Sequence, residues 1–316
     1  MKDKNAVASL HSSKRQKQTL WVQAIKWPLY SVAIMPVILA AGWKQGAGEG
    51  IRLEQFCGFL IASIFLLIWE NLTNDLFDAT TGVDEFKIHS VVALTGKRGL
   101  IRTLAYCILI FGLFLILILA LRSDFAVFLL VAGSCFLGYL YQGPPFRLGY
   151  QGLGEPLCWI AFGPLATAAA LLVLSHGNVS NGIPWDTALL LGAGPAVATT
   201  LVLFCANFHQ VLEDYSHGKK TLIVRLGTKQ AANLVPWFVI LTFGLEWIPI
   251  MHGQWPRTAL LGAIGLPYAI ELIRLLKKHH NHPKMIVESK FLALRFQALN
   301  GIGLSIGLAL GPILNT

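Results

Sequence analysis

Charged residues are scarce in this sequence: Asp, Glu, Lys and Arg make up only 13% of its 316 residues. A soluble globular domain usually carries about 25%, so this composition argues against an ordinary soluble fold. Cysteine is also sparse, and the five cysteines stand singly without CxxC spacing, which gives no pattern for a disulfide or zinc framework. The net charge of +9 does not indicate a nucleic-acid partner, because such proteins present a basic face without long apolar runs.

Long apolar runs dominate the chain, which is 55% hydrophobic and has a mean hydropathy of +0.61. A helix needs roughly 20 apolar residues to cross a bilayer. Nine runs approach that length, at residues 27–43, 53–72, 101–121, 125–142, 156–175, 187–206, 232–251, 257–276 and 291–313. Because the backbone in lipid must satisfy its own hydrogen bonds, we expect these runs to be helices. The sequence therefore predicts an all-α membrane protein with about nine transmembrane helices, consisting of a basic tail at 1–26 and a single polytopic domain at 27–316.

Basic residues lie mostly on one side of the predicted membrane. With nine spans, the N-terminus and the even-numbered loops share a side. That side holds all of the 25 Lys and Arg residues except Lys44, Arg52, Arg122 and Arg257. By the positive-inside rule it is cytoplasmic, or stromal in a plastid. We therefore expect a cytoplasmic N-terminus and an odd number of spans.

The spacing of loops and glycines suggests internal organisation. Two long polar loops, 71–100 and 207–230, follow the second and sixth predicted spans. Their separation predicts two related four-helix halves with a ninth helix appended. In the last span, Gly303, Gly307 and Gly311 recur every four residues. This stripe fits either close packing within the chain, which we favour, or a dimer face.

The first polar loop opens with a cluster of acidic and amide residues. Its members are Asn71, Asn74, Asp75, Asp78 and Asp84. If the second span continues helically to about residue 79, the first four share one face of the helix, and Gly82 then lets Asp84 fold back towards it. No Lys or Arg lies between Glu70 and Glu85 to neutralise these groups. Hard divalent cations such as Mg²⁺ prefer such oxygen ligands. The alternative is a solvated, merely acidic helix end.

The second polar loop repeats this arrangement. Asn207, Gln210 and Asp214 lie at i, i+3 and i+7, beside Glu213, and Lys219 follows closely. Acidic groups followed by cations suit a metal-bridged diphosphate, since lysine and arginine bind the phosphate oxygens that the metal leaves. In the first loop, Lys87, Lys97 and Arg98 are candidates for the same contacts. Alternatively, these basic residues only determine topology.

A third segment, residues 139–156, reaches the same face and is rich in Pro, Gly and aromatic residues. Proline and glycine prevent it from continuing as a helix, so we expect a shaped loop. Tyr139, Tyr141 and Arg147 could line a pocket for a flat, acidic aromatic substrate. The alternative is an ordinary turn.

These motifs, in this order, resemble the UbiA superfamily of intramembrane prenyltransferases. The resemblance rests on Asn74-Asp75-x-x-Asp78 with Gly82-Val-Asp84, then PPFRLGYQGLGE, then HQVLEDYSHGKKT with VRLG, and it covers essentially the whole chain. Within the superfamily the phrases DEFKIHSVVALTGKR and NFHQVLED are most similar to the cyanobacterial and plastid branch of the MenA family. In one departure, Val211 stands where many members have an aspartate.

The resemblance implies a UbiA-like helix bundle that binds a prenyl diphosphate through Mg²⁺. It implies transfer of a prenyl group, phytyl in this branch, to 1,4-dihydroxy-2-naphthoate with loss of the carboxylate, in phylloquinone- or menaquinone-type synthesis. Asp75, Asp78 and Asp214 would be catalytic, and the metal ligands would come from Asn74, Asp75, Asp78, Asp84, Gln210, Glu213 and Asp214. Substrate contacts would come from Asn71, Asn74, Lys87, Lys97, Arg98, Tyr139, Tyr141, Arg147, Asn207, Gln210 and Lys219.

The same resemblance implies a cyanobacterial inner or thylakoid membrane, or a plastid membrane, with the site facing cytoplasm or stroma. Homogentisate or chlorophyllide acceptors are alternatives within the family. A transporter or lipid-binding protein is an alternative outside it. Transporters, however, usually place acidic residues near the membrane midplane, whereas here they lie at helix ends.

Overall fold

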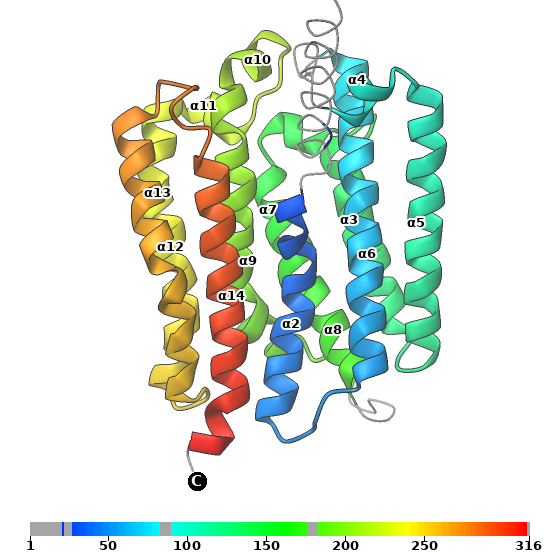
Figure 1. The fold of residues 1–316 in the computed structure, drawn as a ribbon, viewed down its shortest axis with the longest axis vertical. Coiled ribbons are helices and arrows are strands. Elements are labelled where there is room, and N and C mark those ends of the chain that lie inside the picture. Colours follow the sequence, from blue (N-terminus) through cyan, green and yellow to red (C-terminus); the bar gives the residue numbers. More distant parts are fainter. Residues whose placement is uncertain (1–20, 22–26, 83–89, 176–181, 315–316) are drawn as a thin grey trace, which may run out of the picture.

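The computed structural model describes residues 21, 27–82, 90–175 and 182–314, and every regular element within these ranges is a helix (Figure 1). The first half contains η1 (Trp27–Tyr30), α2 (Ser31–Gly46), α3 (Leu53–Thr81), α4 (Val91–Thr95), α5 (Arg98–Leu121), α6 (Ala126–Gln142), η2 (Leu148–Gln151), α7 (Gly154–Ile160), η3 (Ala161–Leu165) and α8 (Ala166–Leu174). The second half contains α9 (Trp185–Ala206), η4 (Phe208–Gln210), α10 (Val211–Ser216), α11 (Leu222–Leu226), α12 (Thr228–Met251), η5 (Arg257–Gly265), α13 (Leu266–His279) and α14 (Ser289–Leu314). The predicted all-α class is confirmed for these ranges.

Seven helical segments of the described chain are long and apolar enough to cross a membrane. They coincide with seven of the nine predicted spans. The other two predictions fall on α2 and α6, which have 16 and 17 residues. In Figure 1 both run alongside the longer helices. The predicted tail, apart from Trp21, lies outside the described residues.

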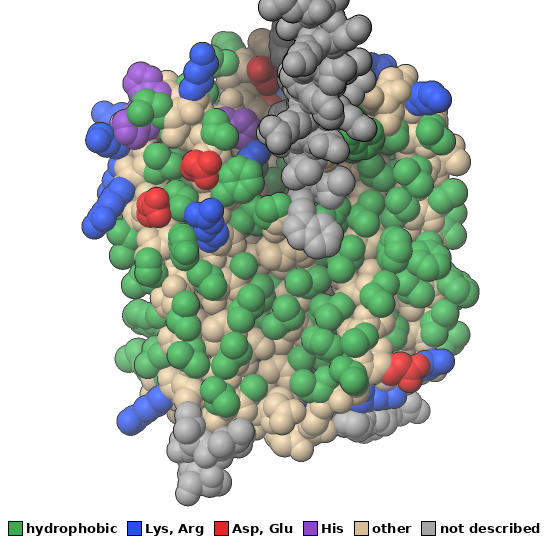
Figure 2. All heavy atoms as spheres, in the orientation of Figure 1, with side chains coloured by type: hydrophobic (Ala, Val, Ile, Leu, Met, Phe, Trp, Pro, Cys, Tyr) green, Lys and Arg blue, Asp and Glu red, His purple; other side chains and the backbone are tan. Residues whose placement is uncertain are grey.

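The bundle is layered from its centre outwards. In the span formed by α9, η4 and α10, 78% of the residues in its most apolar 18-residue stretch are buried. The corresponding share in α5 is 28%. α14 packs against α2, α9 and η5. Figure 2 shows an apolar band around the middle of the molecule, with most of the visible charged side chains at its two ends. This distribution is that of a bundle whose outer helices face lipid.

The glycine stripe of α14 packs against the same chain. A Cβ atom at Gly303 would overlap the carbonyl of Leu261, and one at Gly307 would overlap that of Thr258. The Thr258 hydroxyl donates a hydrogen bond of 2.6 Å to the carbonyl of Gly307. The prediction of close packing within the chain is confirmed. The predicted helical span at 257–276 is confirmed, and the part of it that contacts these glycines, η5, is a 3₁₀-helix.

The chemistry-bearing segments meet at one end of the bundle, the upper end in Figure 1. The C-terminal end of α3, the end of α6, the start of α7 and the short helices α4, α10 and α11 lie there. All three polar segments singled out in the sequence are therefore on one side.

Candidate active site

α3 carries the first acidic cluster beyond the apolar part of its span. It remains helical to Thr81 and ends at Gly82, whose φ of +82° is a left-handed conformation that suits glycine. Asp75 and Asp78 are buried, with 1% and 5% of their surface exposed. The predicted helical extension and its glycine stop are confirmed. Asp84 and Lys87 lie outside the described residues.

Asp75 helps to hold the short helix α4. Its Oδ2 accepts a hydrogen bond of 3.1 Å from the backbone N–H of Val91, the first residue of α4. The side chain of Ser90 caps the same helix by accepting from Ala93. Helix N-termini have backbone N–H groups without partners in the helix, so both contacts stabilise α4. One oxygen of Asp75 therefore already has a structural role.

The i, i+3, i+7 spacing of the second cluster predicted a single α-helix, but the structure shows three helical segments here. α9 ends at Ala206, and the 3₁₀ turn η4 separates it from α10. The tighter turn changes the rotation per residue, and it buries Phe208 against Phe204 at a centroid distance of 5.5 Å. Asn207 and Asp214 are still buried. Gln210 and Glu213 are half-buried.

Lys219 joins the two clusters. Its Nζ lies 3.6 Å from Oδ1 of Asp214 and 4.0 Å from Oδ2 of Asp78. Its backbone N–H donates a 2.8 Å hydrogen bond to the carbonyl of Asp214. The Lys219 side chain is buried, with 7% of its surface exposed. One residue from each cluster, Asp78 and Asp214, therefore lies beside the same lysine.

Tyr150 was not among the predicted site residues, yet it contacts both clusters. Its hydroxyl donates a 2.6 Å hydrogen bond to Oδ1 of Asp78 and lies 2.9 Å from Oγ1 of Thr81. Its ring lies 5.0 Å from Nζ of Lys219. Burial, and secondly the Asp78 carboxylate, raise the pKa of Tyr150 well above its usual range, so the phenol stays protonated and donates.

The third segment forms a compact loop beside the aspartates. Tyr139 closes it by donating a 2.6 Å hydrogen bond to the carbonyl of Pro144. The ring of Tyr141 fills the space over Gly149 and Gly154, where a Cβ atom would collide with it. Arg147 adopts a left-handed φ of +44°, which places its guanidinium 5.8 Å from the ring of Tyr150. The prediction of a shaped loop is confirmed.

Two predicted anion contacts lie towards the surface. Lys97 is exposed at the start of α5. Arg98 is exposed as well and donates a 3.1 Å hydrogen bond to the carbonyl of Ala79, in the last turn of α3. A cation at this place stabilises the negative end of the helix dipole. Neither residue has a described contact with Asp78 or Asp214, so their role in substrate binding stays a prediction.

Several buried polar atoms at this end of the bundle have no hydrogen-bond partner among the described residues. The acceptors include both carboxylate oxygens of Asp214, Oε1 of Gln142 and Oε1 of Glu155, and the donors include Nδ2 of Asn71 and Nε of Arg147. Buried polar groups are normally satisfied, so such atoms point to a ligand or ordered water. Within the described ranges, no three His, Cys, Asp or Glu side chains come close enough to hold a metal ion by themselves.

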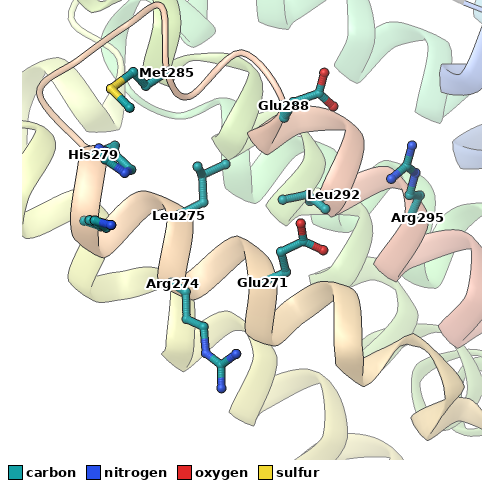
Figure 3. Close-up of a pocket in the computed structure, with 9 residues that line it drawn as sticks. Glu271, Arg274, Leu275, His279, Met285, Glu288, Leu292 and Arg295 are labelled. Carbon is teal, nitrogen blue, oxygen red and sulfur yellow. The ribbon is translucent and has the colours of Figure 1, made fainter.

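A surface cleft of about 360 Å³ lies away from these residues, between α13 and the start of α14. Figure 3 shows Leu275 and Leu292 in the upper part of the cleft, with Glu271 and Arg274 below them and Arg295 to the right. No residue of the three predicted segments lines it. The chemistry predicted from the sequence therefore does not belong to this cleft.

Comparison with known proteins fits this arrangement. The model of the UbiA prenyltransferase family matches residues 33–294. The chain belongs to this family. As a UbiA member it is an enzyme that transfers prenyl groups, and the alternative of a transporter or lipid-binding protein is not supported.

Relatives with similar sequences indicate which members of the UbiA family this chain resembles most. The chain is 38% identical to a 2-carboxy-1,4-naphthoquinone phytyltransferase of Synechocystis over 91% of its length and 92% of that protein. It is 36% identical to the chloroplastic protein of that name from Arabidopsis thaliana, over 92% of its length and 77% of that protein. A 1,4-dihydroxy-2-naphthoate octaprenyltransferase of Mycobacterium tuberculosis is 26% identical, over 79% of this chain and 83% of that protein.

The fold is also found in a solved structure of digeranylgeranylglyceryl phosphate synthase. That structure matches with a TM-score of 0.59 and 16% sequence identity, over 95% of this chain and 99% of the other. At this level of identity the match concerns the fold alone.

Proposed function

We propose that this UbiA enzyme transfers a phytyl group from its diphosphate to 1,4-dihydroxy-2-naphthoate, with loss of the carboxylate, in phylloquinone- or menaquinone-type biosynthesis. The names of the two relatives above 35% identity support this choice. The observation that carries it is a set of buried polar atoms without hydrogen-bond partners among the described residues. Asp214, whose described ion pair is with Lys219, offers acceptors for a cation, while Arg147 and Asn71 offer donors for an anion. A metal-bound diphosphate supplies both partners.

The residues present fit Mg²⁺. Asp78 and Asp214 approach the same point from different halves of the chain, as their shared neighbour Lys219 indicates. Carboxylate oxygens are the ligands that Mg²⁺ prefers, and in phosphate sites it usually takes only one or two of them together with substrate oxygens. Asn74, Asp75 and Gln210 are close in sequence and could support them. When bound, Mg²⁺ would neutralise the charge that develops on the departing diphosphate.

The chain itself binds and orients the donor. Lys219 and Arg147 would contact the diphosphate oxygens and stabilise the charge that appears as the bond to the prenyl carbon breaks. The resulting allylic cation must survive until the electron-rich ring carbon attacks it. Tyr141 lies at the end of α6, where the site meets the apolar interior of the bundle. That interior excludes water and would protect the cation from hydrolysis.

We further propose nine spans, with α2 and α6 crossing the membrane beside the seven longer segments, and a cytoplasmic or stromal N-terminus. The asymmetry of Lys and Arg supports this orientation. It would place the aspartates in the compartment that contains free Mg²⁺. A cyanobacterial inner or thylakoid membrane, or a plastid membrane, fits the sources of the two most similar relatives reported above.

The direct test uses membranes from a heterologous host that expresses the chain. They are offered 1,4-dihydroxy-2-naphthoate, homogentisate or chlorophyllide, each with phytyl, geranylgeranyl or longer diphosphates, with and without Mg²⁺, and products are identified by mass. We expect Mg²⁺-dependent phytyl transfer with release of CO₂. Product formed only from homogentisate or chlorophyllide would contradict the assigned acceptor while leaving the family activity intact.

Isosteric variants test the metal ligands in the same assay. We expect Asp78→Asn and Asp214→Asn to lower transfer by about 100-fold or more, because each removes a charge that the metal-bound diphosphate needs. Membrane insertion, followed by a C-terminal tag, should be unchanged. Near-normal activity in either variant would exclude that residue as a ligand.

A further inference from the structure

We propose that Lys219 competes with the divalent cation for Asp78 and Asp214, and that its ammonium moves from the carboxylates to the diphosphate when the metal binds. This inference rests on the proposed function. It assigns Lys219 two successive partners within one site. In this view the lysine sets the affinity for metal as well as that for diphosphate.

The geometry gives Lys219 and a metal ion the same oxygens. Its Nζ lies 3.6 Å from Oδ1 of Asp214 and 4.0 Å from Oδ2 of Asp78. Neither oxygen of Asp214 accepts a hydrogen bond from any described residue. The Lys219 ammonium is the described positive charge that pairs with this carboxylate. Oδ1 of Asp78 is bound to the Tyr150 hydroxyl, which leaves Oδ2 facing the lysine. Two carboxylates thus share one compensating charge in a buried place.

A metal ion and this ammonium cannot both stay against the same oxygens. Mg²⁺ binds carboxylate oxygens at about 2.1 Å, so an ammonium 3.6 Å from Oδ1 would remain close to the metal. Coulomb repulsion between such close cations costs several kcal/mol wherever the effective dielectric constant is well below that of water. The carboxylates therefore hold one or the other.

The surroundings of Lys219 allow the ammonium to move. The residue lies between α10 and α11, directly after Gly218, whose φ is +72°. Its backbone is fixed by the N–H bond to the Asp214 carbonyl, whereas its side chain has four rotatable bonds. The Tyr150 ring, 5.0 Å from Nζ, is a second favourable neighbour, which can keep contact while the ion pairs with the carboxylates separate.

Competition predicts opposite effects on the two ligands. In Lys219→Met the affinity for Mg²⁺ alone should rise about tenfold, because the competing charge is gone. The affinity for inorganic diphosphate in saturating Mg²⁺ should fall by a similar factor. A lysine that only holds the site together would weaken both. Lys220→Met is the matched control, since Lys220 is adjacent but exposed, and neither affinity should change.

The experiment is titration calorimetry on the purified full-length chain in detergent, first with Mg²⁺ and then with inorganic diphosphate. Tighter Mg²⁺ binding with weaker diphosphate binding supports the proposal. If wild type binds Mg²⁺ and Lys219→Met binds it no more tightly, competition is wrong and the proposed metal site stands. If neither protein binds Mg²⁺, even with diphosphate present, the metal site itself is wrong and the competition falls with it. Lys219→Gln repeats the test if the methionine variant does not fold.

Discussion

The hydroxyl group of Tyr150 holds Asp78 from a neighbouring loop. The bond is 2.6 Å long and donates to a carboxylate, which makes it one of the strong hydrogen bonds in the site. Loss of such a bond costs about 1.5–3 kcal/mol. We therefore expect Tyr150→Phe to lower kcat/KM for prenyl transfer by about tenfold to a hundredfold.

The matched control is Tyr139→Phe in the same loop. Its hydroxyl donates to a backbone carbonyl of Pro144 and to neither aspartate. The two variants are compared at several Mg²⁺ concentrations, because a loosened Asp78 should also raise the Mg²⁺ concentration needed for half-maximal rate. If both variants behave alike, Tyr150 does no more than shape the loop.

Helical spacing and topology predicted that both acidic clusters lie on one side of the membrane, but they could not predict which side chains hold the clusters together. Asp78, Asp214 and Lys219 stand out because acidic residues at helix ends, with a lysine nearby, are unusual in an apolar chain. Tyr150 has no such signal, since its partner lies 72 residues away and the phenol looks like one aromatic residue among several in the loop. The 3₁₀ turn at 208–210 was missed for a similar reason, because it accompanies the burial of Phe208, a tertiary contact that local spacing does not show.

At the scale of elements, the match between α14 and η5 explains why η5 is not an α-helix. Four residues of an α-helix rise about 6 Å, and three residues of a 3₁₀-helix also rise about 6 Å. Gly303 and Gly307 lie four apart and contact Leu261 and Thr258, which are three apart. The three-residue repeat of the 3₁₀-helix therefore has the same axial length as the four-residue repeat of the glycines in α14. The sequence showed the stripe, but the helix type of its partner depends on this pairing.

Gly307→Ala tests that match. The new methyl group would meet the carbonyl of Thr258 and the Cα atom of Ala259, so we expect a loss of about 1–3 kcal/mol and a lower midpoint of thermal unfolding in detergent. Gly244→Ala in α12 is the control, because a Cβ atom there has no described neighbour within 4 Å. Its midpoint should stay or rise. Equal losses in both variants would show that α14 does not depend on this contact.

For the whole molecule, the separation between the cleft of Figure 3 and the aspartates has a measurable consequence. Arg274→Gln with Lys278→Gln removes two cations from the cleft. Both side chains are exposed, and neither has a described ion pair. We expect prenyl transfer within about twofold of wild type, since surface substitutions away from a site have small effects. A large loss of activity would extend the functional surface to α13.

Orientation is tested independently of activity. A short tag on the N-terminus should be cleaved by protease in inside-out vesicles and protected in right-side-out ones, if the basic side is cytoplasmic. A tag inserted after Gln254, at the opposite end of α12, should show the reverse. The same accessibility for both tags would mean an even number of crossings between them, which contradicts the nine-span arrangement with its seven crossings before Gln254.

The joining of the two clusters by Lys219 also implies an order of events during synthesis. α3 is made and can enter the membrane well before residues 214–219 exist, and at 5–20 residues per second the delay is roughly 7 to 28 seconds. During this interval Asp78 lacks Lys219, its ion-pair partner among the described residues. Tyr150, which follows it by 72 residues, emerges first and offers a hydroxyl donor. A nascent chain halted before α10 would therefore expose an acidic helix end that the finished enzyme keeps covered.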